Sequence, residues 1–186
     1  MKKLILLLVL WFLNLGCCFS QIQRTFLGCS FGCNKQVAVQ KIKALGHNIH
    51  KTEEGFTAEH KVSQIVKFGG YTWEFVEFKF HKNRLYNVLF CNSAYTDQAK
   101  TIAQMTYKEL KEKLGKKYIN TPKSDWGVAG ISWTDSRTGV ICRTLYVNNL
   151  GETSYQDSYD EHLNLYLWYY DKLTLKSINK AENNEL

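Results

Sequence analysis

Two aromatic-rich segments joined by a short polar break constrain the fold of this chain most strongly. Along residues 71–80, apolar side chains alternate with polar ones, so that Val76, Phe78 and Phe80 share one face at a period of two. Residues 84–91 repeat this alternation after the turn His81-Lys82-Asn83. Because so short a connection joins antiparallel strands, the pair predicts a β-hairpin.

Two helices are predicted between strand-forming segments. Residues 35–45 place apolar side chains at helical spacing, with Asn34 as the N-cap and Gly46 at the end. In residues 96–115, Thr106 opens a capping box before a second apolar stripe that Gly115 is expected to end.

Strands are predicted again after Pro122, at residues 128–134, 140–147 and 163–170. The last of these is apolar on both faces, which indicates a central strand. Residues 179–186 are polar and are expected to form a frayed tail.

The order of these elements predicts the fold class. Helix followed by strands occurs twice, at about residues 25–95 and 96–178. Short turns between strands favour an antiparallel sheet, which the helices must cover. We therefore expect an α+β fold of tandem helix-then-strands repeats, with the helices packed on one face of an antiparallel sheet.

The N-terminus has the pattern of an export signal. Two lysines precede the apolar run of residues 4–13, which is too short to cross a bilayer but has the length of a signal-peptide core. We predict a signal peptide over residues 1–20, cleaved between Ser20 and Gln21, and a single domain over residues 21–186. The alternative is a lipoprotein acylated at Cys17, which Asn14 three residues earlier disfavours.

Export limits the partners of a basic chain. The formal net charge is +7, which in a cytoplasmic protein would suggest nucleic acid. An exported protein does not meet that partner, so the charge is interpreted as a solvated basic face. The chain after residue 20 has no apolar run long enough for a transmembrane span.

Four cysteines follow the predicted signal: Cys29, Cys33, Cys91 and Cys142. An oxidising compartment permits disulfides, and four cysteines allow three full pairings, among which the sequence does not choose. The spacing Cys29-x3-Cys33 differs from the Cys-x2-Cys of redox enzymes and zinc knuckles. The alternative is that these residues are buried free thiols.

No motif predicts a catalytic centre, a cofactor or a metal site. His47 and His50 follow a helix end, with His60 and His81 further on, but no cysteine or carboxylate stands at ligand spacing. Glu74 and Glu77 are three apart on one predicted strand and therefore point to opposite faces. The serines lack the Gly-x-Ser-x-Gly pattern of a nucleophile elbow.

The aromatic load of the strands is the unusual feature. If helices cover only one face of the sheet, several aromatic side chains must lie on the open face, where they can hold a partner. The predicted binding residues are Trp73, Phe75, Trp133, Tyr166 and Trp168. The alternative is a second core layer or simple cross-strand pairing.

Several segments carry a resemblance: Thr25-Phe26-Leu27-Gly28, Phe31-Gly32, Leu45-Gly46, the stripe of Tyr107, Leu110 and Leu114, and Tyr170-Asp171. In these the chain resembles a group of uncharacterised exported proteins of Gram-negative bacteria. Its architecture is similar to the tandem helix-plus-antiparallel-sheet fold of the beta-lactamase inhibitory protein and of the small lipoprotein of the outer-membrane barrel-assembly machine. The resemblance implies a binding or envelope role and assigns no functional residue.

The predicted function is a non-catalytic exported protein that binds another protein, peptide or glycan of the cell envelope. It would be periplasmic, outer-membrane-associated or secreted. The alternative is a small exported enzyme, thiol-dependent or hydrolytic, whose site has no recognisable motif. No cofactor, metal or nucleic acid is expected.

Overall fold

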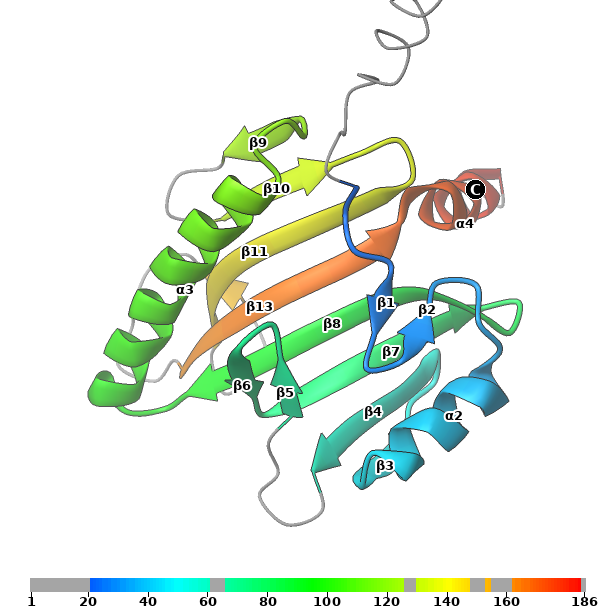
Figure 1. Ribbon diagram of the computed structural model, residues 1–186, viewed down its shortest axis with the longest axis horizontal. Coiled ribbons are helices and arrows are strands. Elements are labelled where there is room, and N and C mark those ends of the chain that lie inside the picture. The colour runs from blue at the N-terminus through cyan, green and yellow to red at the C-terminus, as the bar shows by residue number, and fades with distance from the viewer. Residues whose placement is uncertain (1–20, 61–65, 126–129, 148–152, 155–161, 185–186) are drawn as a thin grey trace, which may run out of the picture.

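The computed structural model describes residues 21–60, 66–125, 130–147, 153–154 and 162–184. Its main sheet contains β3 (His47–Lys51), β4 (Gly55–His60), β7 (Phe75–His81), β8 (Arg84–Ala94), β9 (Lys123–Asp125), β10 (Ile131–Thr134), β11 (Thr138–Val147), β12 (Thr153–Ser154) and β13 (His162–Asp171). Eight strands follow the order β3-β4-β7-β8-β13-β11-β10-β9, and β12 pairs with β11. All pairings are antiparallel, and β13 lies in the middle of the sheet (Figure 1).

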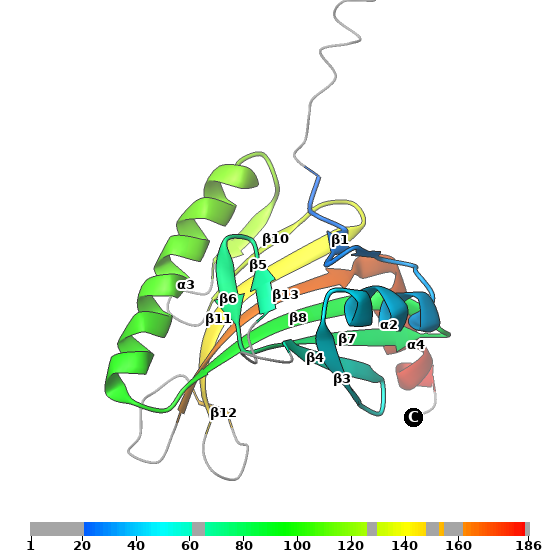
Figure 2. The ribbon, with the colours of Figure 1, turned by 60° about the horizontal axis from the view of Figure 1, so that its bottom comes forward.

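Two small ribbons and three helices complete the described residues. The ribbons are β1 (Thr25–Phe26) with β2 (Cys29–Ser30), and β5 (Val66–Phe68) with β6 (Tyr71–Trp73). The helices are α2 (Lys35–Ala44), α3 (Asp97–Lys117) and α4 (Lys172–Asn184). Both ribbons, α2 and α3 lie on one side of the sheet, the front face, whereas α4 lies on the other side, the back face (Figures 1 and 2).

The α+β class and the antiparallel sheet predicted from the sequence are confirmed, but the tandem arrangement is not. Helix α2 packs on the edge strand β3, whereas α3 packs across β8, β11 and β13. Helix α4 does not join them on the front face, and it occupies most of the segment expected to be a frayed tail. It was missed because its N-terminal cap is the last residue of a strand: the Asp171 carboxylate accepts from the Thr174 N–H at 3.0 Å.

The two predicted helices form, the second with different bounds. Helix α2 begins after Asn34, whose side-chain oxygen accepts from the Gln36 N–H at 2.7 Å, as predicted. Helix α3 begins at Thr96 and runs through both Thr106 and Gly115. A continuous buried stripe on α3, formed by Ala103, Tyr107, Leu110 and Leu114, stabilises the helix beyond those local signals.

The predicted strand over residues 71–80 is broken at Glu74. The Glu74 N–H donates to the Asn92 side-chain oxygen at 2.6 Å and to the Cys91 carbonyl at 3.1 Å. Trp73 therefore belongs to β6, in a hairpin closed by two glycines with positive φ, and folds over the front face. Its indole N–H donates to the Phe68 carbonyl at 3.2 Å.

An aromatic cluster fills the front face beneath the two ribbons. Phe68 stacks on Phe90 with ring centroids 4.2 Å apart, and Phe26 lies 4.7 Å from Tyr169. Trp73 closes the cluster against Phe90 at 5.6 Å. Because each buried aromatic removes about 150–250 Å² from water, these contacts attach the ribbons to the central strands.

Two glycines give opposite predictions for stability. A Cβ at Gly55 would lie 1.8 Å from the Phe78 carbonyl oxygen, so Gly55→Ala must push β4 away from β7 and should destabilise the fold by about 1–3 kcal/mol. At Gly115 the nearest atom is 4.0 Å away, and Gly115→Ala should stabilise α3 by about 0.5–1 kcal/mol. Urea unfolding of both variants measures these changes in unfolding free energy, and equal effects would contradict the close approach of Gly55 to Phe78 where β4 pairs with β7.

Candidate functional site

The back face of the sheet carries half-buried aromatic side chains on β13. Residues of this strand alternate, so that Leu165, Leu167 and Tyr169 face the core while Tyr166 and Trp168 face the back. The register sets their neighbours. Tyr166 lies between Cys91 of β8 and Arg143 of β11. Two residues further along β13, Trp168 lies between Leu89 of β8 and Ile141 of β11.

Arg143, Tyr166 and Trp168 form what we call the Arg143 cluster. The guanidinium carbon of Arg143 lies 5.7 Å from the ring centre of Tyr166 and 6.0 Å from that of Trp168, which are cation–π distances. Within the part of the chain that is described, no carboxylate lies within 4.0 Å of this guanidinium. The Tyr166 hydroxyl accepts from the Asn164 side-chain N–H at 2.8 Å, which fixes its position.

Four buried polar atoms on this face have no hydrogen-bond partner among the described residues. Two are donors, Nε of Arg143 and Nε1 of Trp168, and two are acceptors, the side-chain oxygens of Asn164 and Asn87. Leaving a buried polar group unpaired costs about 1–3 kcal/mol. Four such atoms on adjacent strands indicate that this face is not arranged for stability alone.

The structure separates the five predicted binding residues. Trp73 and Trp133 are each only 1% exposed and lie in the front-face core, so their prediction as partner-facing anchors is wrong. Phe75, Tyr166 and Trp168 are half-buried on the back face, where Phe75 and Tyr166 flank Cys91 in one row.

Arg143 was not predicted, although the sequence contains a signal for it. It is a lone cation in the strand Thr138–Val147, at a position where period two places it beside Ile141 and Leu145 on one face. Gly139, opposite Tyr170 in the pairing of β11 with β13, also shapes the back face. A Cβ at Gly139 would lie 2.1 Å from the Tyr170 ring, so the glycine leaves room for that ring on the back face.

The four cysteines are free thiols, and no disulfide joins them. Cys91 faces the back and Cys142 the front with β13 between them, so these two cannot pair. The Cys29 thiol donates to the carbonyl oxygens of Leu27 at 3.9 Å and Ala38 at 3.8 Å. Burial raises the pKa of Cys29 to about 11 and the pKa of Cys91 and Cys142 to about 12, so these three thiols stay protonated at neutral pH.

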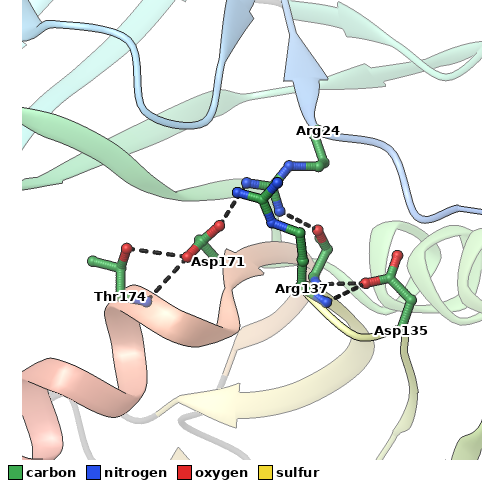
Figure 3. Close-up of polar contacts among 6 residues, drawn as sticks. Arg24, Asp135, Arg137, Asp171 and Thr174 are labelled. Carbon is green, nitrogen blue, oxygen red and sulfur yellow. Dashed lines mark hydrogen bonds and ion pairs between the residues drawn. The ribbon is translucent and has the colours of Figure 1, made fainter.

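A second candidate site is a pocket of about 590 Å³ at the end of the sheet, lined in part by Arg24, Asp135, Arg137 and Lys172. Figure 3 shows the polar contacts beside it. Asp135 accepts from the backbone N–H groups of Arg137 and Thr138 at 2.8 and 2.6 Å, which closes the turn between β10 and β11. The Asp135 carboxylate therefore stabilises this turn.

The N-terminal segment is held at this pocket. Its Ile22 N–H donates to the Asp135 carboxylate at 2.8 Å, and the Ile22 side chain is 1% exposed. Arg24 donates to Thr138 and pairs with Asp171, both at 2.6 Å (Figure 3). Gln21 also lines the pocket, whereas Ser20 and Cys17 lie outside the described residues.

The described residues contain neither a metal-binding group nor a membrane-spanning helix. They contain no group of three or more histidine, cysteine or acidic side chains placed to hold a metal ion. Their helices include none with the length and apolar character needed to cross a membrane. No protein-family model matches the chain, and no match is found among the curated proteins or the solved structures.

The Arg24–Asp171 pair predicts a pH dependence. Burial alone would raise the pKa of the Asp171 carboxyl, but hydrogen bonds from Arg24 and Thr174 outweigh it and lower the pKa below the ordinary value. The stabilisation from ionised Asp171 is therefore complete above about pH 4 and is lost as the pH falls through the folded-state pKa. Asp171→Asn should lower the unfolding free energy at pH 7 by about 1–2 kcal/mol.

The difference between wild type and Asp171→Asn should narrow as the pH falls below about 4. Chemical unfolding from pH 3 to pH 7 measures it. Glu53→Gln, which neutralises an exposed carboxylate in the turn between β3 and β4, is the control and should leave the curve unchanged. A difference that stays constant over this range would show that the pair contributes no pH-dependent stability.

Proposed function

We propose that this protein is an exported, non-catalytic binding protein that holds its partner on the back face of the sheet, at the Arg143 cluster. The partner presents an anionic group beside a flat, partly apolar surface. It belongs to the cell envelope, and the protein acts in the periplasm, at the outer membrane or outside the cell.

One observation carries this proposal. Arg143 is a half-buried cation that rests on two aromatic rings, and no carboxylate of the described residues neutralises it. A partly desolvated charge is costly unless it is paired. An anionic group from a partner would pair with the guanidinium, and Trp, Tyr and Arg are the side chains that most often contribute binding energy at interfaces.

The alternative of a thiol-dependent enzyme is less well supported. A nucleophilic cysteine needs a lowered pKa, whereas burial raises the pKa of all four thiols here. His50 lies 3.6 Å from Glu59, and His81 lies opposite Arg84 in the pairing of β7 with β8. The binding proposal requires none of these groups to react.

The binding proposal is tested with a matched pair of charge variants. Arg143→Met removes the guanidinium and keeps much of its apolar stem, while Lys108→Met removes the same charge from the exposed side of α3. Immobilised protein should retain a component of envelope extract from its own cells, and only Arg143→Met should lose it. Melting curves verify that both variants fold. Equal retention by Arg143→Met would contradict a site at this cluster.

Export is tested by processing. Because Ile22 is buried directly after Gln21, cleavage after Ser20 would remove the predicted signal and leave the folded N-terminal segment complete. Mass spectrometry of the protein from the envelope or medium should find Gln21, or its cyclised form, as the first residue. Recovery of a lipid-modified Cys17 as the first residue would replace this model with lipid anchoring.

A further inference from the structure

The buried polar atoms at and beside the Arg143 cluster include both hydrogen-bond donors and an acceptor, and this limits the chemistry of a ligand. Among the described residues, the buried N–H groups of Arg143 and Trp168 have no hydrogen-bond partner, and neither has the side-chain oxygen of Asn164, whose amide N–H binds Tyr166. A hydroxyl can donate one hydrogen bond and accept two, so a ligand rich in hydroxyls can serve both kinds after small side-chain rotations. A purely anionic ligand could pair only with the donors.

The aromatic rings add a second requirement. Tyr166 and Trp168 are half-buried and adjacent on one strand, so part of each ring is available for contact. Amphipathic rings of this kind bury the C–H faces of a flat ligand while neighbouring polar groups reach its edges. A sugar ring has this combination of an apolar face and a hydroxyl-bearing edge.

The charge supplies the third requirement. The guanidinium of Arg143 is planar and matches a carboxylate, with which it can form two parallel hydrogen bonds. On the neighbouring part of this face, Lys79 of β7 pairs with Glu54 at 2.6 Å and lies 4.0 Å from Glu77, and the Glu74 carboxylate accepts from the Ser93 N–H at 3.0 Å. Arg143 is the cation of β11, and it can pair with the carboxylate of a ligand.

The site lies on a sheet face rather than on a sheet edge, and this separates glycans from peptides. Extended peptides are usually recognised by pairing their main chain with an edge strand. Here the edges are β3 and β9, and the cluster lies on the central strands β11 and β13. The main chain of these strands is already paired on both sides, so recognition must use side chains.

We infer that the Arg143 cluster binds an acidic glycan, an oligosaccharide in which a sugar carries a carboxylate. Arg143 pairs with the carboxylate, Tyr166 and Trp168 stack on sugar rings, and Asn164 hydrogen-bonds to a hydroxyl. This inference rests on the proposed function and names the class of its ligand.

The test uses the processed full chain and a panel of oligosaccharides containing galacturonate, glucuronate, mannuronate or sialic acid. Each acid is compared with its methyl ester, which keeps the rings and hydroxyls and blocks the carboxylate. At least one acid should bind in calorimetry, and esterification should weaken that binding at least about tenfold.

Variants assign the binding to the cluster. Arg143→Met should weaken binding of the acid at least about tenfold and remove the difference between acid and ester, whereas Lys108→Met should bind like wild type. Trp168→Phe removes the indole N–H and the five-membered ring but keeps a six-membered aromatic ring for stacking, so it should bind more tightly than Trp168→Leu. Melting temperatures verify that each variant is folded.

Three outcomes would overturn the inference. Absence of binding to every acid in the panel would exclude this ligand class, while Arg143-dependent retention of envelope material would still support the proposed function. Equal binding of an oligosaccharide acid and its ester would remove the role of Arg143. Binding of oligoglutamate as tightly as the best oligosaccharide would identify an acidic peptide surface as the ligand.

Discussion

The pairing of β13 with both β8 and β11 is the interaction on which the rest of the structure depends. It joins the N-terminal strands β3, β4, β7 and β8 to the C-terminal strands β9 to β11 in one sheet. Each residue of β13 also belongs to one of two surfaces. Leu165 and Tyr169 are packed in the front-face core, and Tyr166 and Trp168 form the back-face cluster. A shift of the register by one residue would exchange these surfaces, so the core residues and the back-face residues of β13 are fixed together.

The N-terminal segment and α4 are attached at one end of that central pair. Arg24 connects β11 to the last residue of β13 through Thr138 and Asp171, and Asp171 also caps α4. This small network fixes the position of Arg24 and of the first turn of α4 relative to the sheet. Because the Arg143 cluster lies further along β11 and β13, the contacts that hold the termini do not use the residues assigned to binding.

Local sequence patterns predicted the positions of helices and strands better than they predicted which face of the sheet each aromatic residue occupies. The apolar run at residues 163–170 predicted the central strand that carries Tyr166 and Trp168, and the Asn34 cap located α2. The alternation over residues 71–80 failed for Trp73, because the Glu74 N–H donates to Asn92 and the preceding residues form a separate hairpin. That contact joins residues distant in sequence, and no local pattern contains it. Likewise, Trp133 is placed by α3, whose buried stripe overrides the Gly115 signal.

Only part of the candidate site could be predicted, because its residues come together from different strands. A count of aromatic residues identified Trp168, but only the cross-strand register brings Arg143 beside it. The sequence also does not show that no carboxylate of the described residues lies close to Arg143, because this depends on how the fold places residues that are distant in sequence.

The position of β13 in the chain also determines when the protein can fold. This central strand comes after all other strands of the sheet in the sequence, so the strands before it lack their middle partner until β13 has been made. Pairings between distant segments form slowly because the loops between them must first be closed. The main sheet should therefore be completed only after β13 is available to pair with β8 and β11.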